Sequence, residues 1–182
     1  MLFNEIYYRN EKRLLNFNTG KVVLRNAVRA IITNENKLLM IHLGKTNEYK
    51  FPGGGMEENE TCEEALKREV MEEAGYRVTE ITEKAGIATE FAVARESKYN
   101  IFKMISEYYI AKIDHSRSEQ KLDGYEKELL FSPCWVEIEK AYKANKEIIE
   151  SGNVSTPWIH RETSVLGILM NKLANMNGRD HG

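Results

Sequence analysis

The sequence lacks the features that would place it in several large classes of protein. Its 182 residues include only two cysteines, Cys62 and Cys134, which provide neither a disulfide framework nor the spaced pairs of a zinc site. No apolar run approaches the roughly 20 residues of a membrane span. The first residues lack the apolar core of a signal peptide. We therefore expect a cytoplasmic protein with reduced cysteines and no membrane contact.

A surplus of positive charge is also missing, since the net charge is −2 and the pI is about 6.1. This balance argues against general nucleic-acid binding, although it leaves room for a small nucleotide ligand. The chain does have 42% hydrophobic and 30% charged residues, which is typical of a folded domain with a core. Its length corresponds to about one such domain.

Strand-like segments lie on both sides of a central helix-like segment. Runs rich in β-branched and aromatic residues predict the strands, and two short polar segments, 18–20 and 34–36, are typical of hairpin turns. Helical periodicity appears at 61–74, at 139–150 and after Pro157, with Thr156 as the N-cap of the last helix. These elements predict the α/β class, with helices packed on a mixed sheet.

The first predicted helix is crowded with negative charge. Between Glu57 and Glu73 there are eight acidic residues and two basic ones. Thr61 and Glu64 have the spacing of a capping box, and the helix macrodipole favours acidic residues in the first turn. Glu60 and the other acids near the start of the helix therefore have a structural explanation.

Three later glutamates, Glu69, Glu72 and Glu73, lack that explanation. They lie where the macrodipole opposes negative charge, and their spacing makes them like-charged neighbours. On a helical wheel Glu69 and Glu73 fall within the apolar arc, with Glu72 at its edge. The apolar arc consists of Cys62, Ala65, Leu66, Val70 and Ala74.

Carboxylates directed toward the interior need a compensating partner. The partner could be a basic side chain such as Arg68, or a hard divalent cation, which prefers oxygen ligands. Three carboxylates on one helix face favour the cation. The glycines at 53–55, just ahead of the helix, can also present a bare backbone carbonyl.

The spacing of these residues resembles the Nudix box. Gly54 is followed after five residues by Glu60, and after seven more by the segment REVMEEAGY, residues 68–76. Every glycine, glutamate and arginine of the family pattern is present, and only Tyr76 departs from it, at a position for a bulky aliphatic residue. The similarity extends loosely from about Ala27 to Tyr142.

Resemblance to the Nudix hydrolase family implies a Nudix-like α/β/α sandwich around a mixed β-sheet. It also implies hydrolysis, with Mg²⁺ or Mn²⁺, of a nucleoside diphosphate linked to another group, which releases a nucleotide and a phosphorylated product. The implied metal ligands are Glu69, Glu72, Glu73 and the Gly53 carbonyl. Arg68, counted with the catalytic residues Glu69 and Glu128, would pair with Glu60 and orient the loop and helix rather than do chemistry. Gly54 would shape the loop, and Gly75 would end the helix.

The resemblance does not identify which residue is the general base. It could be Glu69 within the box, or Glu126 or Glu128 on a later loop, and we prefer Glu128. No substrate-binding residue can be named. The alternative is a nucleotide-sensing protein with the same fold and no catalysis, although the complete set of glutamates argues against it.

We divide the chain into an N-terminal hairpin extension (1–26), a Nudix hydrolase domain (27–176) and a frayed tail (177–182). The hairpin extension is compatible with a homodimer. The expected partner is a small nucleotide-type substrate, with neither membrane nor general nucleic-acid binding.

Overall fold

The structure is a computed structural model, and it describes residues 1–8 and 20–177. In chain order its elements are β1 (Phe3–Tyr8), β2 (Val22–Ile31), β3 (Thr33–Asn34), β4 (Lys37–Leu43), β5 (Glu48–Lys50), α2 (Cys62–Ala74), β6 (Tyr76–Val93), β7 (Ile101–Arg117), α3 (Gly124–Glu128), β8 (Phe131–Glu137), α4 (Ile138–Glu150) and α5 (Ile159–Asn177). Within these ranges, none of the helices combines the length and apolar character that crossing a bilayer would require.

The strands form two four-stranded sheets. The first has the order β1-β6-β7-β2, in which β6 and β7 are antiparallel while both edge strands run parallel to their neighbours. In the second sheet β4 pairs antiparallel with β3, β5 and β8. We expected one mixed sheet, and the strands divide into two because β4 pairs with β8 rather than with β2.

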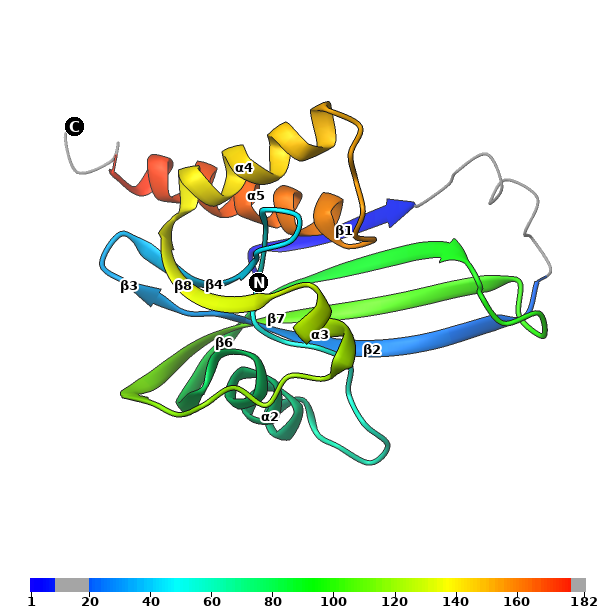
Figure 1. Cartoon of the computed structure of the whole chain (residues 1–182), viewed down its shortest axis with the longest axis horizontal. Coiled ribbons are helices and arrows are strands. Elements are labelled where there is room, and N and C mark those ends of the chain that lie inside the picture. Colours follow the sequence, from blue (N-terminus) through cyan, green and yellow to red (C-terminus); the bar gives the residue numbers. More distant parts are fainter. Residues whose placement is uncertain (9–19, 178–182) are drawn as a thin grey trace.

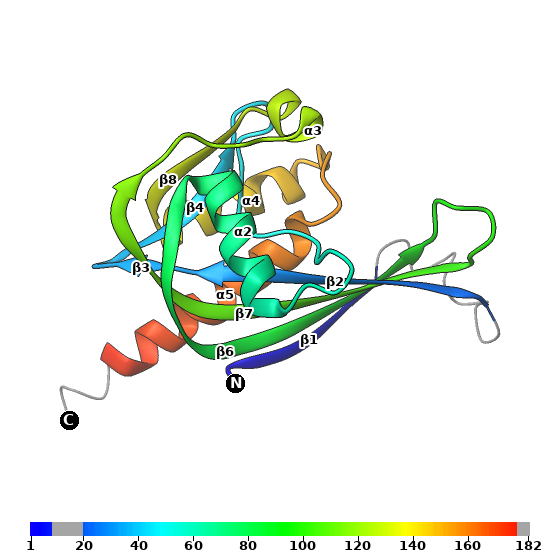
Figure 2. The same cartoon turned by 90° about the horizontal axis from the view of Figure 1, so that it is seen from below.

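Helices cover both sides of the sheets (Figures 1 and 2). α2 packs against β2 and β6, whereas α4 and α5 pack against each other and against β5 on the opposite side. The predicted α/β class with helices on two faces is confirmed. In Figure 2 the far ends of β2, β6 and β7 extend beyond the helices.

Two apolar clusters result from this arrangement, because side chains alternate between the faces of a strand. On β4, Leu38 and Met40 join the cluster beneath α4 and α5, while Leu39 and Ile41 join the cluster beneath α2. A strand buried on both faces reads as a continuous apolar run, and KLLMIHL is such a run.

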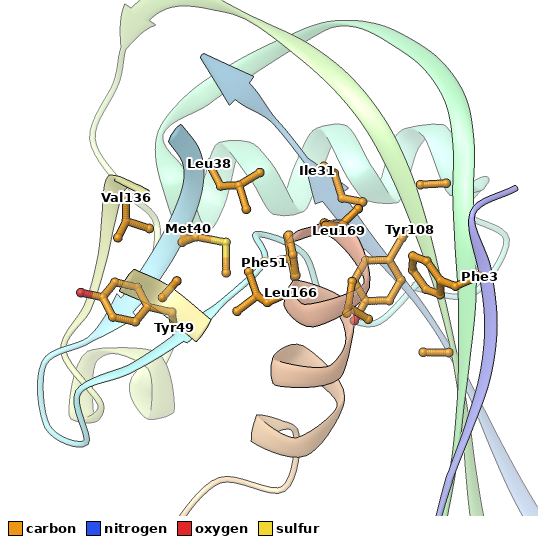
Figure 3. Packing of buried hydrophobic residues seen from close by; sticks show 14 residues of the cluster. Phe3, Ile31, Leu38, Met40, Tyr49, Phe51, Tyr108, Val136, Leu166 and Leu169 are labelled. Carbon is orange, nitrogen blue, oxygen red and sulfur yellow. The ribbon is translucent and has the colours of Figure 1, made fainter. Parts of the chain in front are cut away.

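The first cluster brings Phe51 into the centre of the molecule (Figure 3). Phe51 is fully buried near Leu166 of α5, and its ring meets Tyr108 edge-on at a centroid distance of 5.6 Å. Phe3 of β1 packs on Tyr108 in the same way, at 5.3 Å. The cluster therefore fixes the segment that follows β5.

The turn predicted at residues 34–36 is confirmed. Thr33 pairs with Leu38 and Asn34 with Lys37, so Glu35 and Asn36 close a hairpin, and Glu35 has a positive φ of 51°. A left-handed residue is what a tight two-residue hairpin turn requires.

The proposed hairpin around residues 18–20 lies largely outside the described residues. The described flanks, β1 and β2, are the two edges of one sheet, with β6 and β7 between them. β2 also runs without a break across residue 26. The division of the chain at that point stays a prediction, as does the frayed tail, whose residues 178–182 are not described.

One expectation near the last helices was wrong. α5 begins at Ile159, just after Pro157 as expected, but the Thr156 hydroxyl binds the Glu48 carboxylate instead of capping the helix. The short helix α3 was missed, although Asp123 and Glu126 form a complete capping box at its start. An Asp followed three residues later by Glu is a sequence signature of a helix N-terminus.

We predict that Leu166→Ala lowers the free energy of unfolding by about 2–5 kcal/mol, because it opens a cavity at a fully buried position. Urea denaturation followed by circular dichroism measures the change. Leu24→Ala is the control, since Leu24 is 54% exposed, and we expect a change within about 0.5 kcal/mol. Equal losses for both variants would contradict the assigned core.

Candidate active site

Helix α2 has the ends that its sequence predicts. The Glu64 amide donates to the Thr61 hydroxyl (3.2 Å) and the Thr61 amide donates to the Glu64 carboxylate (2.9 Å), which confirms the capping box. Gly75 ends the helix in a left-handed conformation (φ 75°), and its amide binds the Met71 carbonyl. These ends fix which face of α2 is turned toward the sheets.

That face carries the two glutamates that the helical wheel placed on the apolar arc. Glu69 is 8% exposed and Glu73 is 2% exposed. The Glu72 side chain, at the edge of the arc, is 38% exposed. The prediction that carboxylates enter the interior is confirmed, and the burial of Glu69, followed by the charge of Glu73, raises the pKa of Glu69.

Arg68 joins the start of the box to the carboxylates. Its guanidinium forms two bonds of 2.8 Å to Glu60 and further bonds to Glu69 (2.8 Å) and Glu72 (3.1 Å). A fifth contact reaches the Gly55 carbonyl at 3.1 Å. The Arg68–Glu60 pair that the family resemblance implied is therefore present, and it lowers the pKa of Glu60.

Glu73 is held from the other side by the loop ahead of α2. Its carboxylate forms an ion pair with Lys50 and accepts a bond from the Gly53 amide at 3.0 Å. The Lys50 ammonium also donates to the Gly53 carbonyl (3.2 Å), to which Arg29 donates as well. The Gly53 carbonyl thus lies among positively charged groups at the buried end of the site.

The loop follows β2 closely. The Ala30 amide donates to the Pro52 carbonyl (2.8 Å), and the Val28 amide donates to the Gly54 carbonyl (3.0 Å). Gly53 has a φ of 137°, and a Cβ there would stand 2.1 Å from the Val28 carbonyl oxygen. Only glycine accommodates this backbone and this approach.

Gly54 leaves space for the Glu69 carboxylate. A Cβ at Gly54 would lie 2.3 Å from Glu69 Oε2. The carboxylate and the bare loop therefore lie side by side, and the candidate donors are all oxygens, the ligand type that a hard cation prefers. Arg68 binds Glu69 and Glu72, whereas Lys50 binds Glu73. Within residues 1–8 and 20–177, no three His, Cys, Asp or Glu side chains lie close enough together to hold one ion.

The two later glutamates take different positions on α3. Glu128 is on the exposed side, where its side chain is 67% exposed and forms an ion pair of 2.9 Å with Lys45, which lowers its pKa. Glu126 is partly buried, and desolvation together with the nearby Glu73 charge raises its pKa to about 7. The charge of Glu73 thus acts on Glu126, whereas Glu128 is paired with Lys45.

Lys50 and Glu162 were missed from the sequence as parts of the site. Lys50 is 5% exposed in a strand whose neighbours are also buried, and a charged residue within such a strand is the feature that marks it. Glu162 of α5 accepts a bond from the Phe51 amide at 3.0 Å and lies 4.0 Å from Arg29. Nothing in its local sequence indicates these contacts.

A separate pocket of about 530 Å³ lies where β3, β6, β7 and β8 meet. Its lining includes Ile32, Tyr76 and Trp135, but neither Glu69 nor Glu73. We do not assign the site to this pocket, because a site for anion chemistry must include the groups that carry the chemistry.

The fold and this site together define an α/β protein whose glycine loop meets the buried carboxylates of a helix. A family model of the NUDIX domain matches residues 23–158, so the chain belongs to the Nudix family. A Nudix hydrolase from Nitrosomonas europaea has a similar structure, with a TM-score of 0.54 and 18% identity, over 84% of this chain and 90% of that one. This similarity supports the fold.

A relative from Proteus vulgaris, named 8-oxo-dGTP diphosphatase, is 45% identical over 53 residues. The matched region is 29% of this chain and 46% of the relative, so the match spans about half of that protein's length.

We predict different pH dependences of stability for two variants of α3. Because the pKa of Glu126 is about 7 in the folded protein and near 4.3 when unfolded, the folded state binds more protons between these values. Stability therefore falls as the pH rises through that window. Relative to the original protein, Glu126→Gln should gain stability between pH 5 and pH 8, as measured by urea denaturation.

Glu128→Gln is the matched control, whose pH dependence is expected only below the unfolded pKa of a glutamate. Because Lys45 lowers the pKa of Glu128, its ion pair stabilises the protein above the unfolded pKa and is lost as the pH falls. This variant should not gain stability toward pH 8. The same pH profile for both variants would rule out the different environments assigned to the two carboxyls.

Proposed function

We propose that this protein is a divalent-metal-dependent pyrophosphohydrolase that cleaves a nucleoside diphosphate linked to another group. The observation that carries the proposal is the burial of Glu69 and Glu73 against the glycine loop. Buried carboxylates cost stability, so a helix selected for packing alone would carry apolar residues at these positions. The Proteus relative, named for a diphosphatase activity, supports the same general class of reaction.

Glu69, Glu72, Glu73 and the Gly53 carbonyl would hold the ion, Mg²⁺ or Mn²⁺. When bound, such an ion supplies positive charge that offsets the phosphates and lowers the pKa of water. Arg68 keeps the loop and the helix in register through Glu60 and Gly55.

Glu126 is our choice for the general base. Its Oε2 accepts a bond from the Asp123 amide at 2.9 Å, which fixes the carboxylate and leaves Oε1 to take a proton from water. A base works best when its pKa lies near the working pH, and the pKa of Glu126 is raised to about 7. Glu128, which the sequence favoured, is turned to solvent and paired with Lys45.

Lys50 would contribute a positive charge at the buried end of the site. Its ammonium contacts both Glu73 and the Gly53 carbonyl, and it lies 4.9 Å from the centre of the Phe131 ring. A cation in this position can orient a phosphate oxygen as well as neutralise a carboxylate. Cytoplasmic residence and a homodimer stay predictions.

The first test is a panel of nucleoside diphosphate derivatives and nucleoside triphosphates, incubated with Mg²⁺, with Mn²⁺ or with EDTA. We expect release of a nucleotide from at least one class, only when a divalent ion is present. Binding of a nucleotide without product under every condition would instead support the sensing protein.

Glu69→Gln should reduce metal-dependent turnover at least about 100-fold, because it removes a ligand charge from the centre of the site. The protein should stay folded, since the change also relieves the repulsion between Glu69 and Glu73. Glu63→Gln is the matched control on the same helix, because the Glu63 side chain is 63% exposed. Wild-type turnover in a folded Glu69→Gln variant would refute the assigned site.

The choice of base has its own test. Glu126→Gln should lower kcat by about 10²- to 10⁴-fold, the usual contribution of a general base. Glu128→Gln, at a side chain that is 67% exposed, should leave kcat nearly unchanged. Steady-state kinetics at saturating metal measures both, and a larger loss for Glu128→Gln would reverse the assignment.

A further inference from the structure

The C-terminal helices hold β5 and the residue after it through a series of buried polar contacts. Glu48 accepts from the Thr156 hydroxyl. Asn145 of α4 binds both the amide and the carbonyl of Tyr49, each at 2.8 Å. Glu162 of α5 accepts from the Phe51 amide at 3.0 Å. Of the four residues formed by β5 and Phe51, three are thus bound by α4, α5 or the segment between them.

Glu162 belongs to a group of four buried charged side chains. Glu90, Arg161 and Glu162 are each no more than 2% exposed, and Arg29 is 6% exposed. Arg161 donates to Glu162 Oε1 through two nitrogens, at 2.6 and 3.1 Å, and forms an ion pair with Glu90. Counted over the described residues, the group has two positive and two negative charges, which offset one another on burial.

Stability alone is a weak reason for such a group. Well-packed apolar residues of the same volume often give a fold that is as stable or more stable. The group is also connected to the glycine loop, because Arg29 lies 4.0 Å from Glu162 Oε1 and donates to the Gly53 carbonyl. Glu162 therefore reaches the loop twice, through the Phe51 amide and through Arg29.

We propose that Arg29 and Glu162 are positioning residues that fix the direction of the Gly53 carbonyl. The inference rests on the proposed function insofar as that carbonyl is a metal ligand. Glu162 lies beyond the residue range that matches the family, which ends at 158. The geometry thus connects α5 to the site through Glu162, a residue outside the Nudix box.

The test compares Glu162→Gln with Asn145→Ala. Glu162→Gln keeps an oxygen for the Phe51 amide but removes the charge that pairs with Arg161 and faces Arg29. Asn145→Ala removes two bonds to the same strand without touching Phe51 or Gly53. Because loss of the Arg161 ion pair also lowers stability, the two variants are compared at equal global stability, where a positioning role predicts the larger effect on the loop in Glu162→Gln.

The first measurement is amide hydrogen exchange in the metal-free protein, observed by NMR. The Gly53 amide binds Glu73, and the Val28 and Ala30 amides bind loop carbonyls, so these three amides report on the loop. We expect at least tenfold faster exchange at Gly53 in Glu162→Gln than in Asn145→Ala, compared at equal global stability.

The second measurement is Mn²⁺ affinity, from the loss of the free-ion electron paramagnetic resonance signal. Residues that orient a metal ligand typically contribute about 10- to 100-fold in affinity. We expect about a tenfold loss in Glu162→Gln and less than a twofold change in Asn145→Ala.

Equal effects of the two variants on exchange and on affinity would overturn the positioning role. If the original protein binds no Mn²⁺, the proposed function fails, and the exchange comparison alone then decides the positioning role. If Glu162→Gln does not fold, Arg29→Lys decides it. Lysine lacks the forked geometry that contacts both Glu162 and the carbonyl, so we expect faster Gly53 exchange, and wild-type exchange would overturn the proposal.

Discussion

The structure of the site depends on the burial of the Glu73 carboxylate at the junction of α2, β5 and the glycine loop. This carboxylate accepts a hydrogen bond from the Gly53 amide and forms an ion pair with Lys50, and Glu73 is only 2% exposed. An unpaired charge at this depth would be very costly. The loop and the strand must therefore stay in register with the helix, and Arg68 maintains the same register at the more exposed end.

The two apolar clusters explain how the fold supports this junction. Around β5 the chain alternates, with Phe51 directed into the cluster beneath α4 and α5, and Lys50 directed toward α2. A shift of one residue would exchange these two side chains and bury the lysine among apolar groups. Packing of Phe51 against Tyr108 and Leu166 therefore selects the register in which Lys50 meets Glu73.

Much of the fold and of the box was predictable because the features involved are local. The capping box, the glycine at the end of α2 and the buried face of the helix all follow from spacing within 15 residues or so, on the geometry of a helix. Glu69 and Glu73 could be placed toward the interior for that reason. The division into two sheets could not be predicted, because it depends on which distant strand pairs with β4.

The choice between Glu126 and Glu128 shows the same limit. Both are acids on one short segment, and only the capping box with Asp123 distinguishes them locally by fixing Glu126 at the third helical position. That Glu126 is partly buried and feels the Glu73 charge, while Glu128 pairs with Lys45, depends on where α3 packs. The contact between Glu162 and the Phe51 amide joins residues 111 positions apart, and no periodicity indicates it.

The free-energy cost of burying the Glu69 carboxylate also helps to distinguish a catalytic protein from one that only binds a nucleotide. Burial and the neighbouring Glu73 charge both raise the pKa of Glu69, so the folded protein holds this carboxyl in an unfavourable environment for its charge. A protein that only bound a nucleotide could relieve this cost by replacing Glu69 with glutamine and keep its hydrogen bonds. Retaining the carboxylate is consistent with a requirement for negative charge at that position, which a metal-assisted hydrolysis has and simple recognition of an anionic nucleotide does not.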